Sequence, residues 1–325
     1  MSHTEPTGIS CAKSLWSDTP GTGQQTQFCK PTTQFASANE QCYNAPPGGT
    51  PAVGQGFMIN RLAELYDYRE LIRNLVIRDL KVRYKNSVLG ILWSLLNPLL
   101  MTIVFTVVFA LMLSSDQPDY PVFFMCAYLP WSFLSETVVG GTNSIVGNAH
   151  LIKKVYFPRE ILPLSEVLSG LVNFLLAMIV LFGLILVFQV HMTAAILFLP
   201  IVIAAQIFFI LGMVFFLSTA NVFYRDTQHI MQVVMQAWFF LTPIFYPIDI
   251  IPENATVLGL SINLQFWVRR LNPMASLVAS YRDILFRGAV PGFDFLLRTI
   301  VTCLAIFFIG YFIFCRYSHT FGEEV

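Results

Sequence analysis

The sequence predicts an all-α integral membrane protein with six transmembrane helices, an N-terminal cytosolic interface helix, and re-entrant helices before the last span. Composition is the first reason: hydrophobic residues make up 55% of the 325 residues, charged residues only 12%, and the mean hydropathy is +0.64, well above what a soluble domain needs. The second is a basic segment, Arg69 to Lys85, that runs directly into a long apolar segment. The third is the succession of apolar segments that follows.

Residues 1–57 form the first predicted region, a disordered polar tail. They are rich in Thr, Ser, Gln, Gly and Pro, and they include the run PPGGTP at 46–51. Such a composition buries too little apolar surface to fold. No uninterrupted apolar run follows a basic start, so we do not expect a cleaved secretory signal.

The second predicted region, residues 58–86, contains the interface helix. Its apolar residues fall on one half of a helical wheel and its basic residues on the other, although Asp79 and Arg83 interrupt the apolar half. Basic residues directly before a span hold that end in the cytosol. The polar half would face lipid phosphates or an acidic partner, and both alternatives stay open. The interface candidates are Arg73, Arg78, Lys81, Arg83 and Lys85.

Residues 87–318 are predicted to form the six-span domain, followed by a cytosolic tail at 319–325. A span needs about 20 mostly apolar residues to cross about 30 Å of hydrocarbon. The stretches that meet or approach this length are Val88–Leu113, Val122–Val146, Leu164–Phe188, Ala194–Ala220, Ile230–Pro247 and Phe295–Cys315. Six crossings from a cytosolic start return the C-terminus to the cytosol. Asn97-Pro98 and Thr242-Pro243 are expected to bend the first and fifth spans.

The charges of the connecting loops agree with this alternation, with one exception. The predicted outer loops 114–121 and 189–193 contain no Lys or Arg, whereas the predicted inner loops 148–163 and 221–229 do. The exception is 248–292, which is predicted to lie outside although it contains several arginines. Long external segments escape the charge rule more readily.

This long segment contains two apolar stretches, Leu264–Val268 and Met274–Phe286, that are too short to cross a bilayer. Re-entrant helices fit best, because such elements are tolerated where protein or a wet cavity covers their backbone ends. As re-entrant helices they would form an external gate, with Asn272, Pro273 and Tyr281 as candidates. The alternative is an external amphipathic cap without a gating role.

The loop LIKKVYFPREILP, Leu151–Pro163, combines charged and aromatic residues with two prolines. We expect a short helix lying flat on the cytosolic face. Its basic residues either only enforce the topology or belong to a knob that docks a cytosolic subunit. The docking candidates are Lys153, Lys154, Tyr156, Phe157, Arg159 and Glu160.

Glu136 is an acidic residue deep in an apolar segment, where a charge costs about 2.5–3.5 kcal/mol on insertion scales. It is expected to face a wet pathway, a second protomer or a niche that keeps it protonated, and a proton relay is a weaker alternative. Aromatic rings gather toward the span ends, where interfacial belts explain most of them, but rings that face a passage would contact sugar faces. The channel candidates are Trp131, Phe133, Glu136, Phe239, Phe245 and Tyr246.

Several kinds of chemistry have no motif in this chain. The sequence has no GxxxxGK[ST] and no Ser/His/Asp, HExxH or GxSxG arrangement, and its six cysteines have no CxxC spacing. We therefore expect no catalytic residue, no metal site, no cofactor bound by this chain and no nucleic-acid partner.

Five motifs, taken in order, resemble the permeases of polysaccharide ABC exporters, the type-two exporters of O-antigen, capsular polysaccharide or teichoic acid. They are RDLKVRYKNSVLGILWSLLNPLL at 78–100, LIKKVYFPREILP at 151–163, NVFYRD at 221–226, FFLTPIFYP at 239–247 and LNPM at 271–274. The resemblance spans about Arg61 to Tyr317 and omits the tail.

This resemblance implies a homodimer of multi-pass permeases in the bacterial plasma membrane, with both termini cytosolic. Two cytosolic ABC ATPase subunits would bind ATP and Mg²⁺, the loop 151–163 would couple them to the spans, and the region around Asn272-Pro273 would be the external gate. A lipid-linked glycan would pass between the protomers, among membrane lipids.

Three alternatives stay open. A related permease would export a drug or a lipid. A secondary transporter would show inverted repeats and intramembrane charge pairs. A membrane-bound glycan-modifying enzyme would need a catalytic pair near the interface.

Overall fold

The helices of the computed structural model account for most of the chain that it describes, residues 65–85, 87, 89–112, 119–155, 157–250, 254–257, 260–263, 265, 270 and 272–325. These residues belong to one compact unit, 55–325. The predicted tail, residues 1–57, lies outside the described residues. The longer elements are α3 Arg69–Tyr84, α4 Trp93–Thr106, α5 Tyr120–Thr142, α6 Ala149–Lys154, α7 Ile161–Val187, α8 Leu199–Phe223, α9 Thr227–Leu241, α11 Pro273–Leu285, α12 Phe293–Tyr317 and α13 Phe321–Glu324.

Four helices are long and apolar enough to cross a membrane. They are α5, α7, α8 with the 3₁₀ turn before it, and α12 with the turn after it, and each matches a predicted span. The segment Trp93–Phe109 is a shorter apolar helix, and α9 has 15 residues. The structure thus confirms a helical membrane protein, while the number of six spans stays a prediction.

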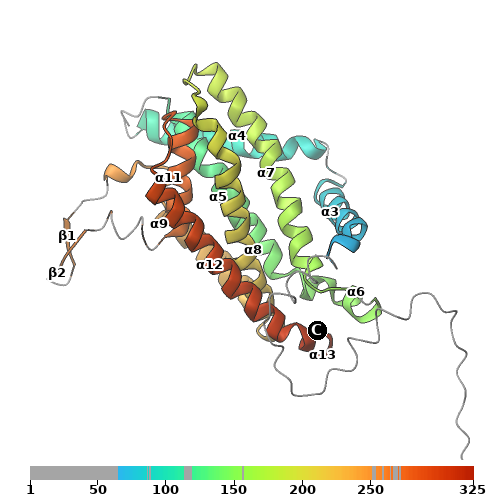
Figure 1. The fold of residues 1–325 in the computed structure, drawn as a ribbon. Coiled ribbons are helices and arrows are strands. Elements are labelled where there is room, and N and C mark those ends of the chain that lie inside the picture. The colour runs from blue at the N-terminus through green and yellow to red at the C-terminus, as the bar shows by residue number, and fades with distance from the viewer. Residues whose placement is uncertain are drawn as a thin grey trace, which may run out of the picture. The chain divides into compact units, whose positions relative to one another are not determined.

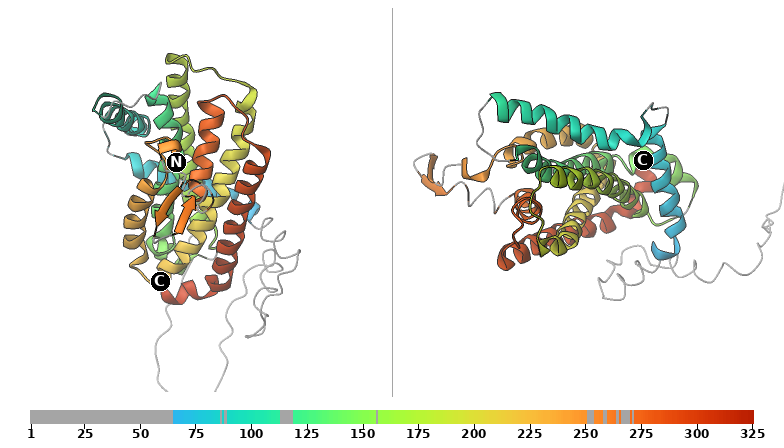
Figure 2. Two further views of the ribbon diagram at one scale, coloured as in Figure 1. Left: turned by 90° about the vertical axis from the view of Figure 1, so that its left-hand side faces the viewer. Right: turned by 90° about the horizontal axis from the view of Figure 1, so that it is seen from above.

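The first apolar segment is not arranged like the others. Helix α4 continues into a π-helical turn, Val107–Met112, and it crosses the bundle transversely in Figures 1 and 2 instead of running along it. Pro98 lies inside α4, and Thr102 Oγ1 donates to the Pro98 carbonyl at 2.8 Å. Helix α4 packs on both α5 and α7, so it covers the side of the bundle where these two helices meet.

Helices α8 and α12 make the most extensive helix–helix contact of the bundle. Glycine permits it: a Cβ on Gly310 would lie only 2.0 Å from the Gly212 carbonyl oxygen, and a Cβ on Gly212 would lie 2.6 Å from the Ile306 carbonyl oxygen. Small residues let membrane helices approach closely, and close packing is a main source of their association.

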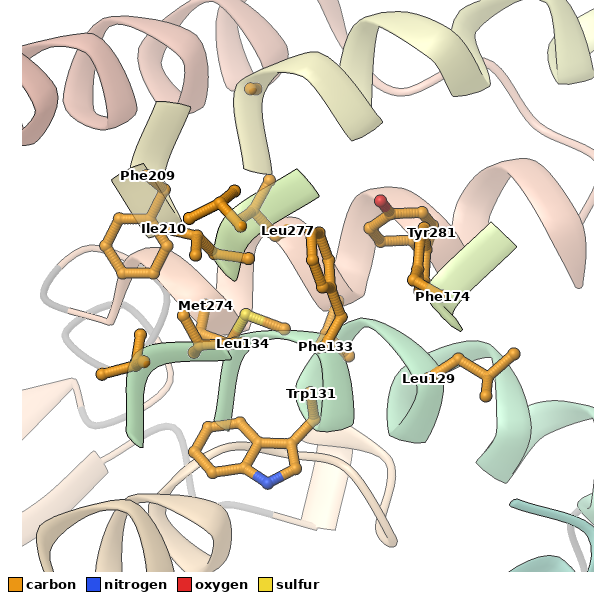
Figure 3. Packing of buried hydrophobic residues seen from close by; sticks show 14 of the residues in the cluster. Leu129, Trp131, Phe133, Leu134, Phe174, Phe209, Ile210, Met274, Leu277 and Tyr281 are labelled. Carbon is orange, nitrogen blue, oxygen red and sulfur yellow. The ribbon is translucent and has the colours of Figure 1, made fainter. Parts of the chain in front are cut away.

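Helix α5 is the centre of the bundle and is largely buried. Gln206 on α8 donates to the Pro130 carbonyl of α5 at 2.7 Å, and the Tyr281 hydroxyl of α11 donates to Gln206 Oε1 at 2.7 Å. Phe133, Phe174 and Tyr281 lie together in the same interior (Figure 3). Polar contacts inside apolar packing thus tie three helices together.

The predicted bend at Thr242-Pro243 is wrong, because α9 ends there. The last helical residue is Leu241, and Thr242 is already extended with ψ of 133°. A residue before proline avoids the helical region, so the chain turns away at this point instead of continuing as a bent helix to Pro247.

A two-stranded antiparallel hairpin departs from the all-α prediction. Strand β1, Asn254–Val257, pairs with β2, Leu260–Asn263, with Asn254 opposite Asn263. The second predicted re-entrant segment is helix α11, at one residue's offset from the prediction, whereas residues 264 and 266–269 of the first lie outside the described residues. A re-entrant position of α11 stays a prediction.

Substituting Gly310 by Ala should destabilise the protein by about 1–3 kcal/mol, because the new methyl group overlaps the α8 backbone. Thermal unfolding of the purified protein in detergent measures this change. The matched control is Gly183→Ala on α7, where a Cβ meets nothing within 4 Å; it should be neutral or stabilise by up to about 1 kcal/mol. Equal unfolding midpoints for the two variants would contradict the close α8–α12 contact.

Candidate functional site

A charged junction, formed by Arg83, Glu136 and Glu166, connects the end of α3 with α5 and α7. Arg83 Nη1 donates to Glu136 Oε2 at 3.1 Å, and Arg83 Nη2 lies 3.8 Å from Glu166 Oε1. A charge inside an apolar bundle is costly unless it is paired or hydrated. One guanidinium therefore supplies the counter-charge for two carboxylates on two different helices.

Backbone geometry supports the charged junction. A Cβ on Gly140 of α5 would lie 2.4 Å from Glu166 Oε1, so a larger residue at 140 would displace the Glu166 carboxylate. The side chains of Arg83 and Glu136 are 35% and 53% exposed, which means that the charged junction is accessible and not sealed in the core.

The charged junction explains why the basic helix has an imperfect apolar face. Arg83 interrupts that face because it points at the carboxylates of the bundle, and Asp79 pairs with Arg78 at 2.8 Å. Arg73 pairs weakly with Glu70 at 4.0 Å, while Lys81 and Lys85 are exposed. The structure thus places the five interface candidates on one helix but brings only Arg83 to the bundle.

A cavity of about 260 Å³ adjoins the charged junction between α4, α5 and α7. We call it the junction cavity. Its polar lining comes from all three helices and from α3: Arg83, Ser94, Asn97, Ser132, Glu136, Thr137 and Asn173. Its aromatic lining is Trp93, Tyr128, Phe133 and Phe174.

A second hollow, the aromatic groove, lies between α4, α5 and α9 and has a volume of about 470 Å³. Trp131 and Phe239 line it, with their ring centroids 5.8 Å apart. Trp131 and Phe133 leave α5 in opposite directions (Figure 3), so the channel candidates are divided between two hollows: Phe133 and Glu136 face the junction cavity, and Trp131 and Phe239 face the aromatic groove.

The remaining two channel candidates, Phe245 and Tyr246, follow the end of α9. Phe245 packs among rings of α4, α5 and α9, with its centroid 5.3 Å from Phe109 and 5.7 Å from Phe239. Tyr246 packs edge-on against Phe245 at 5.0 Å. These rings extend the aromatic wall from the groove toward the α11 end of the bundle.

The loop 151–163 lies at the opposite end, beside α13. Lys153 and Lys154 at the end of α6 are exposed, and they line a pocket of about 340 Å³ together with Phe157, Arg159 and Gly322. The Arg159 guanidinium lies 6.0 Å from the Phe321 ring centroid, and Phe321 is fully buried. The C-terminal helix thus supports this loop, which the sequence did not predict.

Two of the docking candidates are not on the exposed surface of the loop. Glu160 is only 4% exposed, so it is a structural residue of the turn before α7. Tyr156 lies outside the described residues. Lys153, Lys154, Phe157 and Arg159 are therefore the candidates that a partner can contact directly.

The gate candidates Asn272 and Pro273 begin α11, and Asn272 caps it. The Asn272 side chain accepts from the backbone N–H groups of Met274 and Ala275, donates to Thr242 Oγ1 at 3.0 Å and accepts from Trp238 Nε1 at 3.0 Å. This cap fixes α11 to the end of α9. Tyr281 is fully buried and lines neither hollow.

Arg282 forms a clamp at the same end, and the sequence analysis gave it no role. It is 6% exposed, donates to the carbonyls of Pro243 at 2.6 Å and Ile244, and lies 3.7 Å from the Phe123 ring centroid. It therefore satisfies backbone carbonyls that the end of α9 leaves free. A lone arginine within the apolar run Met274–Phe286 was the available signal.

The described residues contain no group of three or more His, Cys, Asp or Glu that could hold a metal ion. The charged junction has two carboxylates, and both are directed at Arg83. Its arrangement is suited to joining helices and to hydrogen bonding in a hydrated cavity.

Comparison with known proteins gives a consistent result. Residues 70–286, from α3 to the end of α11, match the family model described as ABC-2 type transporter. The O-antigen export system permease protein RfbA of Myxococcus xanthus is 34% identical over 269 residues, which cover 82% of this chain and 100% of that protein. RfbA of Klebsiella pneumoniae is 32% identical over 81% of this chain and 96% of its own length. The polysialic acid transport protein KpsM of Escherichia coli is 21% identical over 67% and 82%.

Replacing Arg83 by Gln should lower the free energy of unfolding by about 1–3 kcal/mol, since it leaves two carboxylates without their counter-charge. A double-mutant cycle with Glu136→Gln, measured by denaturation in detergent, should give a coupling energy of about 0.5–2 kcal/mol. Lys81→Gln is the control on the same helix, and its exposed side chain predicts a change below about 0.5 kcal/mol. A coupling energy of zero would refute the charged junction.

Proposed function

The chain belongs to the ABC-2 type transporter family, and on this premise we propose that it is the membrane subunit of an ATP-driven polysaccharide exporter. The observation that carries the proposal is the match to RfbA of Myxococcus xanthus, which extends over the whole length of that permease. The RfbA proteins of Klebsiella pneumoniae and the more distant KpsM also carry names of polysaccharide export or transport.

The substrate in this proposal is a lipid-linked polysaccharide that resembles O-antigen or teichoic acid. It is moved from the cytosolic side across the plasma membrane, and both termini of the chain are cytosolic. The loop charges support this orientation, because Lys153, Lys154, Arg159 and Arg225 fall in loops of the same side. Six crossings, with α4 and α9 as the shorter ones, fulfil this topology.

The energy in this proposal comes from two separate ABC ATPase subunits, which bind ATP and Mg²⁺ on a homodimer of this chain. The sequence has no GxxxxGK[ST] with which to hold a nucleotide phosphate. The aromatic groove supports a passage between the protomers, since it is an open apolar surface on α4, α5 and α9. Helix α11, held by Asn272 and Arg282, is the proposed external gate.

Coupling to the ATPase is assigned to the loop 151–163. Its exposed lysines and the adjoining pocket offer a basic surface with an apolar floor from Ile152 and Phe157. The ring of Phe321 lies beside Arg159, so α12 and α13 carry movement of this loop into the bundle. The charged junction connects the interface helix α3 to α5 and α7 in the same way.

Deletion of the gene tests the function directly. Loss of the surface polysaccharide, with accumulation of its lipid-linked precursor in the cell, is the expected result. An unchanged surface polysaccharide combined with a changed resistance to drugs or a changed lipid distribution would contradict the proposal and favour another cargo.

Reversing the charges of Lys153 and Lys154 to Glu should reduce co-purification of the ATPase subunit by at least about tenfold, because several favourable charge contacts become repulsive. Pull-down from detergent extracts, followed by quantification of both subunits, measures the effect. Arg298→Glu, at the opposite end of α12, is the control and should leave co-purification unchanged. Normal ATPase binding by the double variant would overturn the assignment of this loop.

A further inference from the structure

We propose that the junction cavity binds one uncharged sugar unit of the exported glycan inside each protomer, an inference that rests on the proposed function. The junction cavity lies between α4, α5 and α7, beside the charged junction. Its lining combines unpaired polar groups, a carboxylate held by an arginine and flat aromatic rings. Each of these three features restricts the chemistry of the occupant.

The unpaired polar groups come from α4 and α5. Asn97 and Tyr128 line the junction cavity, and their side chains form no hydrogen bond with any part of the chain that the structure describes. Elsewhere in the bundle the same residue types are paired: the Tyr120 hydroxyl donates to the Phe245 carbonyl at 2.9 Å, and Asn272 makes several hydrogen bonds. An unpaired polar group at membrane depth is costly, so Asn97 and Tyr128 require a partner that hydrogen-bonds with them.

Electrostatics exclude an anionic partner. Arg83 is shared by Glu136 and Glu166, and one positive and two negative groups leave a net negative charge, which repels phosphate and carboxylate ligands. Glu136 bonds Arg83 through Oε2, and its side chain is 53% exposed, so Oε1 is available to accept hydrogen bonds. The preferred ligand is therefore neutral and supplies hydroxyl donors.

The aromatic wall favours a ligand with a flat apolar face. The rings of Phe133 and Phe174 stack with centroids 5.0 Å apart and an interplanar angle of 17°, and both line the cavity beside Trp93. Such rings contact apolar faces without satisfying hydrogen bonds. A sugar ring presents C–H groups on its face and hydroxyl groups at its edge, and it fits both parts of this lining.

The volume limits the size of the ligand. At about 260 Å³, the junction cavity is smaller than the roughly 300–1,000 Å³ of sites for drug-sized molecules, and it therefore holds one sugar ring and not an oligosaccharide. Tyr128 lines both this cavity and the aromatic groove. A sugar in the junction cavity thus lies next to the surface along which the proposed passage runs.

Saturation-transfer NMR tests this inference on the full chain bound to its ATPase subunits in nanodiscs. The probes are the methyl glycosides of glucose, galactose, mannose and rhamnose. At least one should receive saturation from the protein. Asn97→Leu should weaken its binding at least about fivefold, the equivalent of one lost hydrogen bond, and Tyr128→Phe about two- to fivefold. Tyr128→Phe keeps the ring, so it serves as the test if Asn97→Leu does not fold.

Tyr311→Phe on α12 is the matched control, because Tyr311 does not line the junction cavity; it should bind the glycoside as the unsubstituted protein does. The inference is overturned if no glycoside binds, if both cavity variants bind normally, or if inorganic pyrophosphate competes with the glycoside, which would indicate an anion site. Gene deletion separates this inference from the proposed function. If deletion abolishes the surface polysaccharide but no glycoside binds, only the sugar site is wrong; if the polysaccharide persists, the exporter itself is wrong.

Discussion

Charge neutralisation between apolar helices is the constraint that organises the α3 side of the bundle. Glu136 and Glu166 lie on two different membrane-length helices, and neither can be placed there at low cost without a counter-charge. Arg83 supplies it for both. This requirement fixes the end of α3 against the bundle, interrupts the apolar face of α3 and leaves a hydrated, net negative corner that α4 covers.

The opposite end of the bundle follows the same physical rule with neutral partners. Arg282 is directed at backbone carbonyls that the end of α9 leaves free, and Asn272 connects the start of α11 to Trp238 and Thr242. Apolar packing alone does not orient helices in a membrane, because lipid tails solvate apolar side chains equally well. Directional polar contacts at both ends, together with the close approach at Gly310, therefore specify the arrangement.

The sequence was sufficient wherever structure depends on local composition. Helices α5, α7, α8 and α12 were predicted because length and hydrophobicity define them without reference to the rest of the chain. The basic loop and α11 were predicted for the same reason. The family was also evident from ordered motifs, since these are local strings of residues.

What the sequence did not predict depends on contacts between distant residues. Arg83 and Glu136 are 53 positions apart, and no periodicity in either segment indicates that they meet. The transverse course of α4 and the clamp of Arg282 are likewise results of tertiary packing. The end of α9 before Pro243 was misjudged as a bend, because proline permits both outcomes and the Arg282 clamp on the Pro243 and Ile244 carbonyls stabilises the turn.

The central claim is that this chain provides the passage and that a different polypeptide provides the energy. Reconstitution into liposomes tests it most directly, with a lipid-linked glycan in the outer leaflet and ATP supplied on the side where the ATPase subunits face. The account predicts glycan translocation only when this chain, the ATPase subunits and ATP are all present. Translocation against a gradient, or hydrolysis of ATP, by this chain alone would contradict it.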